Sequence, residues 1–424
     1  MVQRFIRRSG EFELNTQTRN GQAAPSLAAT SNGGFIAVWS DGSGIGGDLF
    51  DTGIKGQRFD SAGNKIGAEF LVNTTTRQIQ NASHVTVLSS GKFVVTWTDL
   101  QVVDNGVISD IRGRLFNADG TPAGNEFVVN TAPSKSGGSD VVALSGGGFV
   151  VTWADGSQQG GDANGQAIHG QVFSAAGARV GAEFVANTTT AGSQVAPTIG
   201  ALASGGFVIS WGDSSQTGGD TSLSAIRLQM FSALGAKVGT EKLVNTVTDQ
   251  AQTLPSITTL KSGGFAVFWT DASKLADTSG TGIKGQLYDS AGAKVGGEFL
   301  VNTVTDGDQR RARASGLPDG GFIVTWESST ASASGVDIKA QIFDATGKKV
   351  GTEFFVESST IGNQSGQHVV TLSSGDIVLA WGDSVQTGAD SSSSAIRARI
   401  IGAGSAVPSD IALSNALVSE TSAA

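Results

Sequence analysis

Cysteine is absent from this chain of 424 residues, and histidine and tyrosine are scarce, with three copies and one. The absence of cysteine excludes disulfide bonds, thiol nucleophiles and cysteine-ligated metals. The formal net charge of −9 disfavours nucleic acid as a partner. No stretch approaches the roughly 18 apolar residues of a membrane span. Residues 1–10 are basic but lack the apolar segment of an ordinary signal peptide.

Recognisable catalytic motifs are missing as well. The sequence contains no G-x-S-x-G, H-E-x-x-H or P-loop pattern. The histidines, His84, His169 and His368, share no motif, and the acidic residues are spread evenly, whereas an active site should be singular. We therefore predict that the chain is not an enzyme. Carboxylates are abundant enough to leave a glycosidase or lyase open, with the unusual segment 100–104 as its only candidate location.

Tryptophan, in contrast, recurs on a fixed period of 55 to 58 residues. A period of this length indicates one structural unit copied along the chain. Each tryptophan ends a nearly all-apolar run, so we predict that it packs between neighbouring units. The alternative is a ring of exposed aromatic side chains that stack on sugars. The seven copies are Trp39, Trp97, Trp153, Trp211, Trp269, Trp326 and Trp381.

Each repeat predicts four short β-strands. In the first copy they cover 25–29, 35–39, 54–59 and 69–74, which are rich in Val, Ile, Phe and Trp and are bounded by Gly, Asn, Asp and Ser. Ser-Gly-Gly and Asp-x-x-Gly segments predict tight hairpin turns between them. Four antiparallel strands in seven copies predict an all-β fold, a seven-bladed β-propeller, with an open β-solenoid as the alternative.

The two ends of the repeat array complement each other. A fourth-strand motif at 11–16 precedes the first tryptophan, and the last copy ends after its third strand at 396–401. We therefore expect the N-terminal strand to complete the last blade, which removes open sheet edges. The propeller would cover residues 1–405, and residues 406–424 would form a linker and the truncated start of another domain.

Loops between strands two and three, and between strands four and one, hold the length variation and most of the aspartates, so we predict binding on that face. Asp follows Trp by two residues in six copies, and a second Asp follows seven residues later in four. Carboxylates with loop carbonyls suit Ca²⁺, the candidate cofactor. Alternatively, each Asp stabilises its own turn. The candidate ligands are Asp41, Asp48, Asp155, Asp162, Asp213, Asp220, Asp383 and Asp390.

Two further series repeat near these loops. An Asn-Thr pair is followed by Gln seven residues after the Asn, as in Asn73 and Gln80. These amides could satisfy the backbone between blades or recognise a carbohydrate. A basic residue follows the third-strand Ile, and it either pairs with the loop carboxylates or meets an acidic polysaccharide. The basic series is Lys55, Arg112, His169, Arg227, Lys284, Lys339 and Arg397.

The repeat G-x-E-F-x-V-N-T, L-x-S-G-G-F-V-V-x-W-x-D, I-x-G-Q-x-F-D-x-x-G resembles the tandem repeats of very large bacterial RTX-type calcium-binding adhesins and related type I secreted proteins. The resemblance covers residues 11–401 and specifies no activity. Glycine-rich nonapeptide calcium repeats are absent. Residues 408–420 resemble the opening strand of a cadherin-like domain, which implies that Glu420 is a calcium ligand.

These observations predict a non-catalytic binding or scaffold module of a secreted bacterial adhesin. The module would be a monomeric domain of a longer chain at the cell surface, stabilised by Ca²⁺ and binding a carbohydrate or protein, without nucleic acid or membrane partners. The competing prediction is an enzyme, a glycosidase or lyase on an extracellular polysaccharide. A third alternative is a propeller that only presents other domains.

Overall fold

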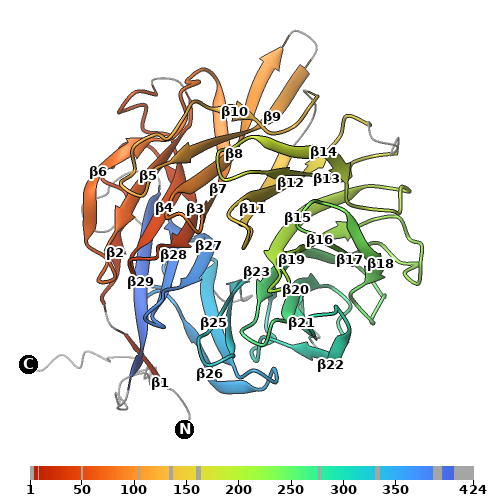
Figure 1. Ribbon diagram of the computed structural model, residues 1–424. Coiled ribbons are helices and arrows are strands. Elements are labelled where there is room, and N and C mark those ends of the chain that lie inside the picture. The colour runs from red at the N-terminus through yellow and green to blue at the C-terminus, as the bar shows by residue number, and fades with distance from the viewer. Residues whose placement is uncertain are drawn as a thin grey trace, which may run out of the picture.

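The computed structural model describes residues 4–404, apart from 8, 49–50, 104–105, 133–136, 159–163, 276, 278, 330–334 and 385–393. The described residues form 29 strands in seven sheets arranged around a central channel (Figure 1). The predicted all-β, seven-bladed β-propeller is therefore confirmed. Within the described ranges there is no helix, and hence none that could span a membrane.

Six blades are sheets of four consecutive antiparallel strands, with the first strand next to the channel. Blade one contains β3 (Gln22–Ala29), β4 (Phe35–Asp41), β5 (Gly53–Phe59) and β6 (Lys65–Leu71). Blade two contains β7 (Ile79–Val87), β8 (Phe93–Val103), β9 (Gly106–Phe116) and β10 (Phe127–Val128). Blade three contains β11 (Gly137–Ala143), β12 (Phe149–Asp155), β13 (Ala167–Phe173) and β14 (Arg179–Val185). Blade four contains β15 (Gln194–Ala201), β16 (Phe207–Asp213), β17 (Ala225–Phe231) and β18 (Lys237–Leu243). Blade five contains β19 (Gln252–Thr259), β20 (Phe265–Asp271), β21 (Gly282–Tyr288) and β22 (Lys294–Leu300). Blade six contains β23 (Asp308–Gly316), β24 (Phe322–Ser329), β25 (Asp337–Phe343) and β26 (Lys349–Phe355).

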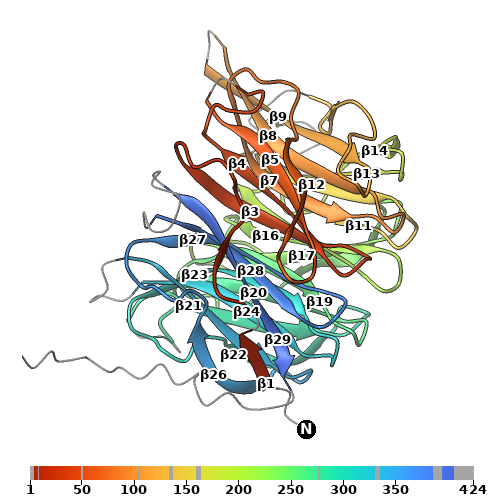
Figure 2. The same ribbon diagram turned by 90° about the vertical axis from the view of Figure 1, so that its left-hand side faces the viewer.

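Blade seven combines the two ends of the described chain. Its strands β27 (Gln364–Thr371), β28 (Ile377–Asp383) and β29 (Ala395–Gly404) are completed by β2 (Phe12–Glu13) and β1 (Arg4–Arg7), which both pair with β29. Figure 2 shows β1 beside β29. The backbone N–H of Leu14 donates to the carbonyl of Ile396 at 2.9 Å. Closure by the N-terminal strand is thus as expected, while the cadherin-like segment and Glu420 lie outside the described residues.

The core lies between blades. All seven tryptophan side chains are fully buried. Trp211 of blade four, for example, shares one apolar cluster with Ile168 and Ala186 of blade three, and the ring pair Phe207–Phe231 stacks at 5.0 Å beside it. The predicted packing between neighbouring units is confirmed, and the exposed sugar-stacking ring is excluded because no tryptophan ring reaches solvent.

The fourth strand begins and ends earlier than predicted, at Lys65–Leu71 instead of 69–74. Gly67 adopts a φ of 72°, within a register shift between β5 and β6. A left-handed residue suits a bulge, and glycine reaches it without strain. The Gln57 amide donates to the carbonyls of Arg58 and Ile66 there. The K-V-G and Q elements of the repeat thus build one bulge, a role that strand composition alone does not indicate.

Inner strands carry a second bulge, at the side of the channel where strand four connects to strand one. One residue in each inner strand has positive φ, and in six of these strands it follows the conserved repeat Gln by two positions. Each ladder shifts register at this point. A bulge bends its strand and redirects the side chains that follow. The seven residues are Ala24, Ala82, Gly138, Ala196, Leu254, Arg311 and Gly366.

Candidate active site in the central channel

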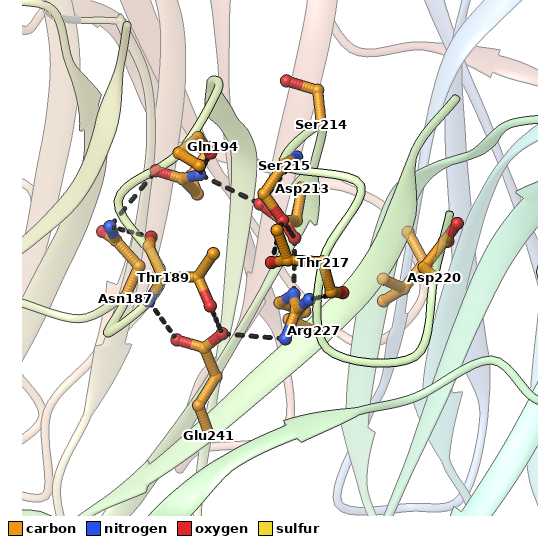
Figure 3. Close-up of polar contacts among 12 residues, drawn as sticks. Asn187, Thr189, Gln194, Asp213, Ser214, Ser215, Thr217, Asp220, Arg227 and Glu241 are labelled. Carbon is orange, nitrogen blue, oxygen red and sulfur yellow. Dashed lines mark hydrogen bonds and ion pairs between the residues drawn. The ribbon is translucent and has the colours of Figure 1, made fainter. Parts of the chain in front are cut away.

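The repeated Asp, Asn, Gln and basic residues form an internal network in each blade. In blade four, the Gln194 amide donates to Asp213 at 2.9 Å, and the Asn187 amide donates to Gln194 at 3.2 Å (Figure 3). The Arg227 guanidinium bridges Asp213 and Glu241, with a 3.1 Å contact to the latter. The network therefore joins the loop carboxylate to the inner strand and the outer strand, which is a structural role for the repeat.

The same arrangement recurs around the ring, and it confirms the interpretation that the basic series pairs with loop carboxylates. Blade six departs from it, because Ser328 stands at the Asp position and the ion pair of Lys339 among the described residues is with Glu353, at 3.0 Å. Blade three substitutes a histidine for the permanent cation. The carboxylate–base–carboxylate groups are Asp41–Lys55–Glu69, Asp99–Arg112–Glu126, Asp155–His169–Glu183, Asp213–Arg227–Glu241, Asp271–Lys284–Glu298 and Asp383–Arg397–Glu13.

The predicted calcium ligands are distributed unevenly over this network. Asp48 accepts from the Asn73 amide at 2.9 Å, and Asp220 accepts from the backbone of Ser222 at 2.8 Å. Figure 3 shows Asp220 turned away from Asp213, so the structure does not bring this predicted pair together. Asp162 and Asp390 lie outside the described residues. Calcium binding stays a prediction.

Blade three holds the one described group of carboxylate and imidazole side chains arranged closely enough to ligate a metal ion. Ligand atoms of Asp155, His169 and Glu183 all lie within 4.8 Å of one another. The His169 Nδ1 atom lies 2.6 Å from Glu183. Burial opposes ionisation of Glu183, but hydrogen bonds from His169 and Thr131 outweigh it and hold the pKa of this carboxyl below its ordinary value. Glu183 is therefore ionised at neutral pH.

A cavity of 330 Å³ lies in the central channel, within the size range of small-molecule sites. Each inner strand contributes to it the residue that pairs with the position before the tryptophan. We call this set the channel ring. Unlike the rim networks, the ring does not repeat its chemistry. Its members are Ser26, His84, Asp140, Thr198, Ser256, Arg313 and His368.

Two adjacent members of the channel ring form a dyad. The His84 Nδ1 atom lies 3.3 Å from an oxygen of Asp140, whose other oxygen accepts from Thr198 Oγ1 at 3.2 Å and from the Ile199 backbone at 3.1 Å. Burial opposes ionisation of Asp140, but the contacts with His84 and Ile199 lower its pKa. A carboxylate that accepts from Nδ1 leaves the Nε2 lone pair of the imidazole available for proton transfer.

Arg313 and His368 lie on the blades opposite this dyad. The Arg313 guanidinium donates to the Ala312 carbonyl at 3.1 Å and makes no ion pair within the described part of the chain. His368 Nδ1 accepts from the Leu27 backbone at 3.4 Å. Burial and the positive charge of Arg313 lower the pKa of His368 to about 3, so its imidazole is neutral. The ring thus contains one carboxylate, which contacts His84, and one guanidinium that makes no direct ion pair among the described residues.

Blade six supplies two further arginines above the ring. Arg310 Nε contacts Glu327 at 3.3 Å, and Arg311 Nη1 contacts the same carboxylate at 3.4 Å. Glu327 is buried and also accepts from the Gly366 backbone at 3.0 Å. Its direct ion-pair partners among the described residues are therefore Arg310 and Arg311, while Arg313 feels this carboxylate only at longer range.

Ring residues also tie neighbouring blades together. Ser26 Oγ accepts from the backbone of Val85 in the next blade at 3.3 Å, and His368 and Asp140 accept equivalent bonds from Leu27 and Ile199. Part of the ring chemistry is therefore structural. Arg313 makes no such bond to a following blade among the described residues, so its charge is not explained by blade packing.

Sequence reasoning missed the channel ring. Aligning the repeats on their tryptophans shows that His84 and His368 share one repeat position, and that blade six carries the run Arg310–Arg313 in place of a Pro-Ser type inner strand. Both signals were present, but neither looks catalytic without the knowledge that this position faces a channel. The segment at 100–103 instead extends β8 into a projecting hairpin (Figure 2), with Asp104 outside the described residues.

No family model matches this sequence, and no curated protein matches it. Similar solved structures include a protein of unknown function from Dyadobacter fermentans, with 10% identity, a TM-score of 0.54, and coverage of 95% of this chain and 100% of that one. Another is a GH93 α-L-arabinofuranosidase of Fusarium graminearum with arabinobiose, at 10% identity and a TM-score of 0.51, covering 76% and 92%. A third is a fungal AA5-family alcohol oxidase with copper, at 11% identity and a TM-score of 0.55, covering 95% and 77%. At such identities these similarities establish a shared fold.

The finding that enzymes are built on this fold contradicts the prediction that the chain is not an enzyme. That prediction rested on the even spread of acidic residues around the rim. The rim carboxylates are occupied by internal ion pairs, so their even spread says nothing about catalysis. The polar set that differs from blade to blade among the described residues is the channel ring.

Proposed function

We propose that this chain is a carbohydrate-processing enzyme whose active site is the channel ring. The observation that carries the proposal is the non-repeating set His84, Asp140, Arg313 and His368 around one cavity, within a scaffold whose other polar residues repeat blade by blade. Equivalent positions of the blades are expected to carry different residues around the channel if one ligand is bound there by several blades at once.

Solved propellers of similar fold support a sugar as the ligand class. Two of them are an arabinofuranosidase and an arabinanase, each in complex with arabinobiose. In our proposal His84 is the general acid or base and Asp140 orients its imidazole, the pairing in which a carboxylate fixes the tautomer of a catalytic histidine. Export to the cell surface, as in the bacterial repeat proteins that this sequence resembles, belongs to the same proposal.

Substrate panels test this directly. Purified chain would be incubated with neutral and acidic plant and bacterial polysaccharides, and new chain ends would be counted. Replacing a general base costs roughly 100- to 10,000-fold in rate, so His84→Gln should abolish most of the activity. His169→Arg, a histidine substitution at the rim, is the matched control and should leave activity unchanged. No product from any polymer, or full activity in His84→Gln, would overturn the proposal.

A further inference from the structure

The lining of the channel is positively charged in an otherwise acidic protein. Arg311 and Arg313 both line the cavity, while Asp140 is the one carboxylate among its described lining residues. The chain as a whole carries a formal charge of −9. A local excess of positive charge within a low-dielectric cleft attracts anions and repels the cations that the rest of the surface would gather.

Arg313 is the residue of this cavity that indicates which kind of anion would bind. Arg313 is partly exposed in the cavity, and the fork of N–H groups of a guanidinium matches a carboxylate in two parallel hydrogen bonds. Among the described residues, its guanidinium donates to the Ala312 carbonyl alone. Glu327, the buried carboxylate of the same blade, is held by Arg310, Arg311 and the Gly366 backbone. A ligand carboxylate in the cavity would fit the remaining donors of Arg313.

We infer that the channel binds a uronate unit of an acidic polysaccharide, with the sugar carboxylate on Arg313, and cleaves the chain by β-elimination with His84 as the base. This inference rests on the proposed function, and it adds the substrate class and the reaction type. The alternative reaction, hydrolysis, ordinarily employs two carboxylates flanking the scissile bond. The described lining of the cavity supplies one.

Elimination needs a base, a cation and a leaving oxygen. The His84 Nε2 lone pair removes the proton from the carbon next to the carboxylate, and Arg313 stabilises the negative charge that develops on the carboxylate oxygens. The electron pair of the broken C–H bond forms a carbon–carbon double bond. The bond from the neighbouring carbon to the glycosidic oxygen breaks, and that oxygen leaves with its electron pair and takes a proton from the His84 imidazolium. Protons and electrons balance without an oxidant.

Binding is measured first, by calorimetry with oligomers of polygalacturonate, alginate and hyaluronan, and with fully methyl-esterified oligogalacturonate as the neutral analogue of the first. We expect one of the acids to bind and the neutral ester to bind far more weakly. A charge-assisted hydrogen bond is worth roughly 1.5–3 kcal/mol, so Arg313→Gln should weaken acid binding about 10- to 100-fold. Arg313→Lys should recover part of the loss. Arg19→Gln, at an exposed position outside the cavity lining, should bind as the wild type does.

Cleavage is followed by the ultraviolet absorbance of the conjugated double bond, which hydrolysis does not produce. Thermal unfolding of each variant would confirm that it folds. The inference is overturned if none of the three acids binds, or if Arg313→Gln binds the acid as tightly as the wild type does. Cleavage of neutral polymers that depends on His84 would uphold the proposed function while overturning the uronate assignment. Acid binding through Arg313 without cleavage of any polymer would overturn the proposed function and the elimination step together.

Discussion

His169 in blade three holds the position that Arg227 holds in blade four. Each pairs across the strand ladder with the tryptophan of its own blade, Trp153 or Trp211. Each also contacts the outer-strand glutamate, at 2.6 Å from His169 to Glu183. A guanidinium keeps its charge at any physiological pH, whereas a histidine side chain can lose its charge near neutrality. Blade three is therefore the described blade whose rim network contains a histidine in place of a permanent cation.

Replacing this histidine by arginine should stabilise the protein most at alkaline pH. The pKa values of Asp155 and Glu183 are lowered in the folded protein. These carboxyls therefore stabilise the fold at pH values above their unfolded pKa, and this contribution is lost as the pH falls through their folded pKa. A guanidinium keeps its charge as the pH rises, as a histidine need not. His169→Arg should then add about 1–3 kcal/mol at about pH 8, and less at about pH 5.5. Thermal unfolding at both pH values measures the difference.

The control for this experiment is Lys284→Arg in blade five. Its lysine already supplies a permanent charge to Asp271, at 3.1 Å, so any change should be the same at both pH values. An equal gain from His169→Arg at the two pH values would show that the gain comes from packing and not from charge.

Calcium binding by the loop carboxylates is still only the prediction made from the sequence, and the ion pairs argue against it. Lys55 lies 3.4 Å from Asp41, and Asn73 donates to Asp48, so Ca²⁺ would have to displace these donors. We expect the melting temperature to be the same in EDTA and in excess Ca²⁺. A ligand that binds only the folded state at 100 times its dissociation constant would add about 2.7 kcal/mol. A rise of that kind, lost in the Asp41→Asn/Asp48→Asn double variant, would establish a calcium site in blade one.

Blade six contains a buried glutamate where other blades have asparagine. In blade two, Asn130 accepts from the Ile111 backbone and donates to Asp110 at 3.1 Å. Glu357 keeps the first contact, to the Ile338 backbone at 3.1 Å, but cannot donate when ionised. Burial, together with the nearby Asp337 carboxyl, raises the pKa of Glu357 to about 8.

Restoring the repeat residue should therefore remove a pH-dependent loss of stability. A carboxyl whose pKa is higher in the folded state contributes most below the unfolded value, and the contribution declines as pH rises from there to the folded value of about 8. At about pH 8, Glu357→Asn and the longer Glu357→Gln should both unfold at higher temperature than the wild type, with an unfolding free energy larger by roughly 1–4 kcal/mol. Below about pH 4.5 the advantage should vanish. A wild-type stability that is flat between these limits would contradict the assignment.

The repeat made the architecture predictable because each motif has a local structural cause. Trp211 marks a buried strand by its apolar neighbours, and the N-terminal motif around Leu14 marks the missing strand of blade seven. The channel ring was not predictable in the same way. His84 and Arg313 are separated by 229 positions in the sequence, and only ring closure brings their blades around one cavity. A consensus of the seven repeats also leaves these residues out, because it keeps only the positions at which the blades agree.

Ring closure itself makes a prediction about Leu14. This side chain is fully buried against blade seven, as Val72 is at the equivalent place in blade one, and both backbones donate to the third-strand isoleucine of their blade. Truncating a buried leucine costs roughly 2–5 kcal/mol. The strand β6 before Val72 is covalently linked to β5, whereas β2 reaches β29 only by non-covalent contacts. Leu14→Ala should therefore detach β2 and speed amide hydrogen exchange along the outer edge of β29 selectively. Val72→Ala should lower global stability without that local opening, and equal exchange in the two variants would mean that the closure is not the weak point of the ring.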